Sequence, residues 1–122
     1  MRQIDIPQKI IDIARKEAEK SNVRRAKVSA LVLDKKLRHI IAKAHNTLCM
    51  DNSTKFTIHA EEAVILKTRR DLNNLTIFVY RRKKIGAGTS KPCCKCAKLL
   101  EIAGTKRVIY MDNHNDFVLE QM

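Results

Sequence analysis

The sequence predicts an α/β fold built on a mixed sheet of four or five strands. Segments with apolar residues at helical spacing alternate with short apolar segments rich in β-branched residues, in the order α-β-β-α-β-α-β. Such an order is typical of a layered sheet with helices packed on it. The chain has 122 residues, of which 44% are hydrophobic, and this suits a single globular domain with one core over residues 1–122.

The first half of the chain predicts one helix and one hairpin. Residues 7–21 carry apolar side chains at helical spacing on one face. Residues 28–33 and 37–44 are dense in apolar and β-branched residues, and the turn Asp34-Lys35-Lys36 separates them. They are therefore predicted to be antiparallel partners. Residues 45–57 are polar and are predicted to be irregular.

The second half predicts two more helices and two or three more strands. Its predicted elements are a helix over residues 59–70, a strand over 75–80, a helix over 93–103 and a strand over 108–111. Gly104 is predicted to end the second of these helices. Residues 113–122 are expected to add a short fifth strand or a docked tail.

Two short motifs carry candidate chemistry: His59-Ala60-Glu61, and Cys93-x-x-Cys96 after Pro92. Two cysteines at this spacing on a helix start can bind one ion, and a histidine at another helix start can supply a third ligand. Three ligands leave a fourth tetrahedral position of zinc for water, whose pKa zinc lowers to about 7. The motifs predict one zinc per chain, bound by His59, Cys93 and Cys96, with Glu61 as the catalytic proton carrier.

Other roles for the cysteines remain alternatives. A lone Cys-x-x-Cys pair is often redox-active or part of a closed structural zinc site, which Cys94 or Cys49 could complete. Cys94 lies between the two ligands, and the two motifs together are more specific than either one alone. An open catalytic site is therefore favoured.

These motifs and their surroundings resemble the cytidine/deoxycytidylate deaminase superfamily over nearly the whole chain, most closely its deoxycytidylate deaminase-like branch. The segments that carry the resemblance beyond the two motifs are Ala18–Val32, Ala44-His45-Asn46, Cys96–Leu100 and Ala103–Tyr110. The resemblance implies a three-layer α/β/α fold with helices on both faces of the sheet. It also implies a hydrolytic deaminase that converts cytosine to uracil and releases ammonia.

Candidate substrate contacts come from the resemblance and from the residues themselves. The resemblance implies that Asn46 contacts the sugar and that the backbone N–H of Ala60 holds the carbonyl oxygen of the base. Phe56 is favoured as a core residue but could stack on the base, and Pro92 is a further candidate contact. Phe117 could close the pocket from the C-terminal tail.

The net charge of +12 favours polyanionic partners, although a solvated basic surface would also explain it. Arg81 to Lys84 are expected either near the pocket mouth, where phosphates would lie, or in a solvated loop. Cytidine, deoxycytidine or their nucleotides are the preferred substrates. The first alternative is deamination of cytosine or adenine in single-stranded DNA or RNA, which the low aromatic content mildly disfavours. A non-catalytic zinc protein that binds nucleic acid is the second alternative.

The expected setting is a cytoplasmic homo-oligomer. No run of about eighteen apolar residues and no secretory signal is present, so neither a membrane span nor export is expected. Three of the four cysteines lie within four residues, which suits metal or redox chemistry in a reducing cytosol. The resemblance implies an oligomer, because relatives commonly complete their pockets across subunit contacts.

Overall fold

The computed structural model describes residues 2–24, 26–82 and 89–122, and its elements keep the predicted order, with a fifth strand within residues 113–122 and three strands beyond those five. The elements are β1 (Arg2–Gln3), α1 (Gln8–Glu19), β2 (Lys27–Leu33), β3 (Ile40–His45), β4 (Thr47–Asp51), β5 (Thr54–Ile58), α2 (Ala60–Thr68), β6 (Thr76–Arg82), α3 (Cys94–Ile102), β7 (Arg107–Met111) and β8 (Phe117–Gln121). None of these described helices is long and apolar enough to cross a membrane.

The central sheet has six described strands, in the order β1-β8-β7-β6-β2-β3. The prediction of four or five strands is therefore wrong. The two-residue strand β1 pairs with β8 at the other end of the chain, and no local sequence pattern predicts β1. β6 and β7 run parallel, while the other neighbours are antiparallel, so the sheet is mixed as predicted.

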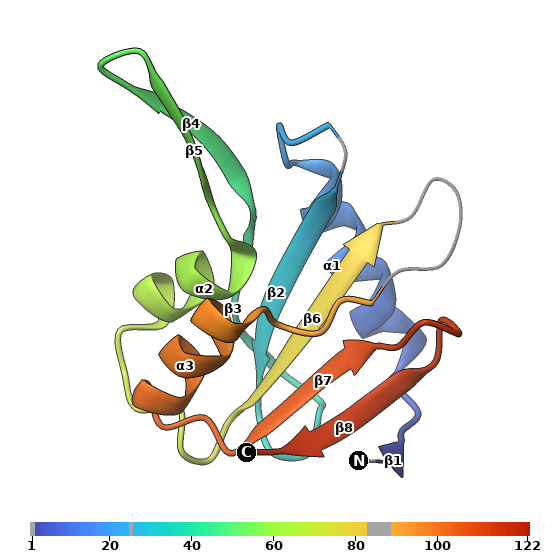
Figure 1. The fold of residues 1–122 in the computed structure, drawn as a ribbon. Helices are drawn as coiled ribbons and strands as arrows, with labels where there is room; N and C mark the ends of the chain where they lie inside the picture. The colour runs from blue at the N-terminus through green and yellow to red at the C-terminus, as the bar shows by residue number, and fades with distance from the viewer. Residues whose placement is uncertain (1, 25, 83–88) are drawn as a thin grey trace.

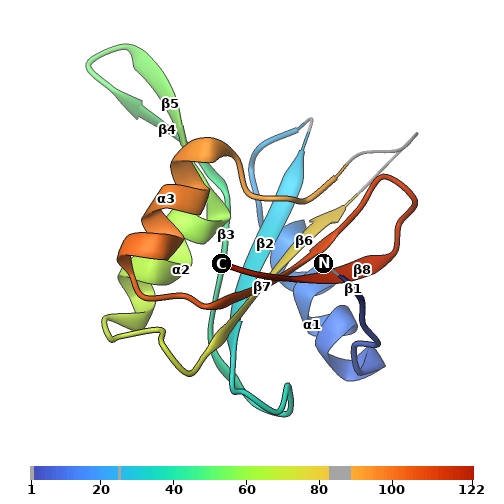
Figure 2. The same cartoon turned by 60° about the horizontal axis from the view of Figure 1, so that its bottom comes forward.

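Helices cover both faces of the sheet, which confirms the three-layer α/β/α arrangement (Figures 1 and 2). The alternation of side chains along the strands explains the layers. On β2, Val32 packs in the cluster that includes α2 and α3 residues, whereas Leu31 packs with α1. On β6, Val79 and Phe78 divide between the two faces in the same way. Both faces of the central strands are therefore buried.

The predicted hairpin β2–β3 is confirmed, with Ala30 opposite Ala44. Its second strand begins at Ile40 rather than at residue 37. Leu37 has a left-handed backbone (φ 59°), and Asp34 accepts hydrogen bonds from the N–H groups of Arg38 and His39. The turn is therefore longer than the sequence indicates, because Asp34 caps it.

The prediction that residues 45–57 are irregular is wrong, because they contain the hairpin β4–β5. This hairpin projects from the body of the molecule as an arm (Figure 1). Asn52 and Ser53 both have positive φ values, 47° and 70°, as a two-residue type I′ turn requires. The strands on either side of this turn contain residues that favour β structure, namely Leu48 to Met50 on β4 and Phe56 to Ile58 on β5, but the polar residues around them hide this preference.

Helices α2 and α3 begin one residue later than predicted. His59 and Cys93 are extended cap residues that precede the first helical turn. Each is joined to its helix by a backbone hydrogen bond, from Ala63 to the His59 carbonyl (3.0 Å) and from Ala97 to the Cys93 carbonyl (2.8 Å). The end of α3 agrees with the prediction, since Gly104 follows it with a φ of 92°. Both candidate metal motifs therefore lie at helix N-termini.

Candidate active site

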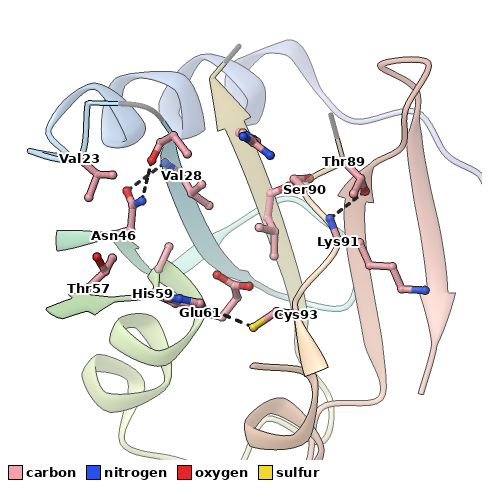
Figure 3. Close-up of a pocket in the computed structure, with 14 residues that line it drawn as sticks. Val23, Val28, Asn46, Thr57, His59, Glu61, Thr89, Ser90, Lys91 and Cys93 are labelled. Carbon is pink, nitrogen blue, oxygen red and sulfur yellow. Dashed lines mark hydrogen bonds between the residues drawn. The ribbon is translucent and has the colours of Figure 1, made fainter. Parts of the chain in front are cut away.

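A cavity of about 350 Å³ lies where the first residues of β2 meet the last residues of β6 (Figure 3). Residues from the N-terminal part of β2, the start of α2, β6 and the segment before α3 surround it. Its lining consists of Val23, Ala26, Val28, Asn46, Thr57, His59, Ala60, Glu61, Val79, Arg81, Thr89, Ser90, Lys91 and Cys93. Side chains that are distant in the sequence, including both motifs, thus meet at this site.

The three predicted metal ligands lie together at one side of the cavity. The Nδ1 atom of His59 is 3.1 Å from the Sγ of Cys96 and 3.7 Å from the Sγ of Cys93. All three ligand atoms lie within 4.8 Å of one another. Cys96 is buried in the first turn of α3, His59 is half-buried, and Cys93 is exposed. The site is accordingly open on the side of Cys93.

The donor set and its spacing fit zinc. Bonds of about 2.1 Å to nitrogen and about 2.3 Å to sulfur at a tetrahedral angle separate the two donor atoms by about 3.6 Å. The two His59–cysteine distances, 3.1 and 3.7 Å, bracket that separation. Neither Cys94, which is exposed, nor Cys49, on the β4–β5 arm, belongs to the group. The described residues therefore offer three ligands rather than four.

Burial disfavours negative charge at the two anionic groups of this site. It raises the pKa of the Cys96 thiol, and the nearby Glu61 carboxylate and Cys93 thiol raise it further. The pKa of Glu61 also lies above its usual range because of burial, although its own backbone N–H, His59 and Cys96 partly oppose that effect. A cation bound beside these groups would favour their ionised forms. Ionisation of Cys96 in this buried setting therefore requires a positive charge close to its sulfur.

Glu61 lies in the first turn of α2 and points into the cavity beside Cys93 (Figure 3). Only 5% of its surface is exposed, and its charge lies near the N-terminus of the helix, where acidic groups are favoured. The neighbouring carboxylate, Glu62, is less buried and does not line the cavity. Of these two acidic residues, only Glu61 is therefore placed to exchange a proton with a molecule in the cavity.

Asn46 lines the cavity, but its side chain also fastens the start of β2. The Asn46 Nδ2 donates to the Ala26 carbonyl (2.7 Å), and the Val28 N–H donates to the Asn46 Oδ1 (3.0 Å). The Asn46 backbone N–H donates to the Val28 carbonyl (3.0 Å). One N–H of the amide and one lone pair of its oxygen remain for a ligand. Asn46 is thus a clamp as well as a candidate sugar contact.

The other predicted contacts lie in different places. Ala60 is buried in the lining, and its N–H belongs to the first helical turn, where such groups have no partner within the helix. Phe56 lies on the β4–β5 arm and is 45% exposed, so its expected place in the core is wrong, and it does not line the cavity. Pro92 borders a separate cavity of about 280 Å³ behind α3.

Phe117 does not close the pocket as expected. It lies at the start of β8 and packs edge-on against Phe78, with ring centroids 5.4 Å apart, in the layer that faces α1. That layer is on the opposite side of the sheet from the two motifs. The expectation was wrong because strand alternation, rather than proximity in sequence, decides the face on which a side chain lies.

Two basic residues border the cavity. Arg81, near the end of β6, is one of the residues expected at the pocket mouth. Its neighbour Arg82 instead forms an ion pair with Glu19 (2.9 Å), and Lys83 and Lys84 lie outside the described residues. Lys91 also borders the cavity, although its ammonium group points toward Glu120 on β8, at 3.7 Å (Figure 3).

Several lining residues were not predicted. Val28 and Val79 form an apolar wall of the cavity. Thr89 and Ser90 lie in the segment that leads from the ends of β6 and β7 to Cys93. The position of Ser90, shortly before the cysteine motif, is the one signal that could have drawn attention to it. Its hydrogen-bond partners are distant in the sequence.

Residues 5–112 match the family described as "Cytidine and deoxycytidylate deaminase zinc-binding region". Searching the curated proteins gives no significant match. Among solved structures, the apo form of the dCMP deaminase from the cyanophage S-TIM5 resembles this chain, with 24% identity and a TM-score of 0.62. The likeness covers 83% of this chain and 78% of the cyanophage chain. The same enzyme in complex with dCMP and dUMP gives 22% identity, a TM-score of 0.59, and coverage of 83% and 76%.

A cytidine deaminase from Burkholderia pseudomallei has a TM-score of 0.69 at 16% identity, and the likeness covers 96% of this chain and 93% of that one. At these identities the structural likeness concerns the fold. It agrees with the three-layer arrangement of the sheet and helices, and it spans almost the full set of described elements.

Proposed function

The chain belongs to the cytidine and deoxycytidylate deaminase family, and on that premise we propose that it is a zinc-dependent hydrolytic deaminase. The proposed reaction converts cytosine to uracil with the consumption of one water molecule and the release of ammonia. The preferred substrate class is a cytosine nucleoside or its nucleotide.

One observation carries this proposal: a histidine and two cysteines converge within 4.8 Å beside a buried glutamate that faces a cavity. His59, Cys93 and Cys96 are the residues that would hold zinc. When bound, zinc supplies a Lewis acid that makes a water molecule more acidic. A ligand set of three is typical of catalytic zinc sites, whereas structural sites bind the metal through four residues.

Glu61 would carry the protons of the reaction. Its carboxylate would accept one proton from the attacking water and deliver it to the ring nitrogen of the base, and would then accept the second proton, from the added hydroxyl group, and transfer it to the departing amino group. The low exposure of Glu61 supports this role, since bulk water is largely excluded from the carboxylate. The backbone N–H of Ala60, in the same helical turn, would hold the carbonyl oxygen of the base.

A cavity residue favours a substrate that bears phosphate. Arg81 borders the cavity, and guanidinium groups bind phosphate oxygens well, whereas the ammonium group of Lys91 is directed toward Glu120. The cyanophage enzyme of similar fold was solved with dCMP and dUMP, a pair of deoxynucleotides related by this same deamination. We therefore propose that a cytosine nucleotide is preferred over the free nucleoside.

A second candidate substrate is single-stranded DNA or RNA. The net charge of +12 favours it, because phosphate contacts dominate the affinity for polynucleotides. The described lining of the cavity contains no aromatic side chain on which neighbouring bases would stack. The nucleotide therefore remains the first choice, and salt-sensitive turnover of an oligonucleotide alone would reverse that order.

The direct test is an ammonia-release assay with the zinc-loaded protein. It compares cytidine, deoxycytidine and their monophosphates with adenosine and with a single-stranded oligonucleotide that contains both C and A. We expect Glu61→Gln to lower turnover by about 10²- to 10⁴-fold while zinc content stays near one per chain. Glu62→Gln is the matched control, since Glu62 is adjacent but lies outside the cavity. Undiminished turnover by Glu61→Gln would refute the assigned role.

The phosphate preference has its own pair of variants. Arg81→Ala is expected to raise KM for the monophosphate by about tenfold and to leave KM for the nucleoside nearly unchanged, as loss of one charged contact implies. Arg82→Ala is the control, because Arg82 pairs with Glu19 and does not line the cavity. Equal effects of Arg81→Ala on both substrates would contradict a phosphate contact.

We further propose that the protein works as a homo-oligomer. The β4–β5 arm exposes Leu48, Met50 and Phe56 by 39%, 68% and 45%, and an isolated two-stranded hairpin is only marginally stable in water. Light scattering of the wild type and of Met50→Ser/Phe56→Ser tests this. A monomeric wild-type protein at micromolar concentration would contradict the proposal.

A further inference from the structure

Ser90 lies where β6 and β7 separate, three residues before Cys93. Its side chain is 5% exposed and forms part of the cavity wall (Figure 3). The parallel ladder between the two strands pairs Phe78 with Ile109, and this is its last pair. Beyond that point β6 still pairs with β2 and β7 with β8, but the backbone groups that β6 and β7 direct toward each other need other partners, since they remain inside the protein.

The Ser90 hydroxyl supplies those partners. The bonds of a parallel ladder alternate between strands, so the next one would join the Met111 N–H to the Val79 carbonyl. The hydroxyl lies between these two groups. It accepts a hydrogen bond from the Met111 N–H (2.6 Å) and donates one to the Val79 carbonyl (2.8 Å). One side chain thus joins two strands at the point where they diverge toward the cavity.

Backbone and side-chain bonds tie the rest of this segment to the same residue of β7. The Ser90 N–H donates to the Met111 carbonyl (2.9 Å), and the Thr89 hydroxyl donates to that carbonyl as well (2.9 Å). The Thr89 hydroxyl also accepts from the Lys91 N–H (3.0 Å). Residues 89–91 are therefore held on the sheet immediately before the chain turns to Cys93.

The two cysteine ligands depend on this attachment to different extents. Cys96 is buried within α3, whereas Cys93 is an exposed cap residue whose side chain makes no capping hydrogen bond. The place of Cys93 is therefore set by the backbone on its two sides, which are the hydrogen bond from the Ala97 N–H to the Cys93 carbonyl and the segment that leads to the residue. A shift of a few tenths of an ångström there would alter the distance between Cys93 and His59, now 3.7 Å.

We infer that Ser90 is a positioning residue for the metal site, which holds Cys93 in register with His59 and Cys96 by fastening the incoming segment to β6 and β7. This inference rests on the proposed zinc site. Groups that orient metal ligands from outside the coordination sphere commonly change metal affinity by about 10- to 100-fold when they are removed. Loss of the Ser90 hydroxyl is expected to act in that range.

The test measures zinc affinity by competition with a chromogenic chelator, for the wild type, Ser90→Ala, Ser90→Thr and Ser29→Ala. Ser29 of β2 is the matched control, because it is likewise a buried serine whose hydroxyl donates one hydrogen bond to a carbonyl, that of Ala14 (2.7 Å), on the face away from the motifs. The thermal midpoint of each metal-free variant is recorded alongside. We expect both alanine variants to lower that midpoint, while only Ser90→Ala weakens zinc binding, by about 10- to 100-fold.

Retention of the hydroxyl in Ser90→Thr is expected to restore zinc affinity, which a loss of general stability would not explain. Equal zinc affinity of Ser90→Ala and Ser29→Ala would overturn the inference. If Ser90→Ala does not fold, Thr89→Val removes the second hydroxyl of the segment, and unchanged zinc affinity in that variant would overturn it too. A wild-type protein that binds no zinc would instead refute the proposed function, so the two failures are distinguishable.

Discussion

Replacement of Asn46 by alanine separates its structural role from its role in the cavity. The residue is 6% exposed, and its amide makes two hydrogen bonds to backbone groups at the start of β2, those of Ala26 and Val28. Alanine removes both bonds and leaves a partly buried carbonyl and a partly buried N–H without these partners. Each such loss costs about 1 kcal/mol or somewhat more, so the free energy of unfolding should fall by about 2 to 3 kcal/mol.

Asn22→Ala is a closely matched control. The Asn22 Nδ2 donates to the Leu48 carbonyl (3.0 Å), and the Leu48 N–H donates to the Asn22 Oδ1 (2.7 Å), so the same two kinds of bond are lost. Both of these bonds are exposed, and water can replace the amide after substitution. The expected loss of unfolding free energy is therefore below about 1 kcal/mol.

Urea denaturation of the metal-free proteins measures both changes without interference from zinc or substrate. A decrease of about 2 to 3 kcal/mol corresponds to a fall of roughly 10 °C in the thermal midpoint for a chain of this size. Equal destabilisation by Asn46→Ala and Asn22→Ala would refute the argument, because burial is the main difference between the two pairs of bonds. A normal stability of Asn46→Ala with a raised KM would show that Asn46 acts only on the substrate.

Three further predictions concern pH, a turn and the metal. Burial favours a higher pKa for Glu17, but hydrogen bonds from His45 and Lys20 outweigh it and hold the pKa below its usual range. The stability that Glu17 contributes is therefore present above about pH 4.3 and is lost as the pH falls through the lowered pKa of Glu17. Between about pH 7 and pH 2, the thermal midpoint should decrease less steeply with decreasing pH for Glu17→Gln than for the wild type. Parallel curves for the two proteins would contradict this prediction. Gly104→Ala should lower the urea midpoint by an amount equivalent to about 1 to 3 kcal/mol, because the φ of Gly104 is 92° and a Cβ there would clash with Asp71 Oδ1. An unchanged midpoint would be inconsistent with that geometry. Removal of zinc by a chelator should lower the thermal midpoint. Addition of zinc at about 100 times its Kd should raise the free energy of unfolding by about 2.7 kcal/mol, whereas magnesium should not change it.

Much of the fold is predictable because its signals are local. The helical spacing in residues 8–19 and the apolar runs of β2, β6 and β7 each lie within a dozen residues. β1 carries no such signal, because it is a strand only through its pairing with β8, where Arg2 lies opposite Leu119. The β4–β5 hairpin has a local turn signal in Asn52 and Ser53, but the polar composition of the whole segment favours an irregular structure.

In the candidate site, too, the residues with a local sequence signal were predictable, and those placed by long-range pairing were not. The two motifs indicate a metal site by themselves, since the residue types and the spacing of Cys93 and Cys96 across one helix start already point to that chemistry. The face on which Phe117 lies depends on the register of β8 against β7, and that register was not evident from the sequence. Likewise, Phe56 lies outside the core because the β4–β5 hairpin is not part of the central sheet.

The three candidate metal ligands come from two helix starts that share no backbone hydrogen-bond ladder, so their mutual distance depends on the packing of α2 against α3 and on the connection of both segments to the sheet. Two buried polar side chains make that connection on opposite sides of the cavity. Asn46 fastens the end of β3 to the start of β2, and Ser90 fastens the segment before α3 to β6 and β7. Each side chain satisfies backbone groups where a strand pairing stops, and each borders the cavity that the diverging strands leave open. The same interruption of the sheet therefore creates the space for a substrate and requires the polar side chains that hold its walls in place.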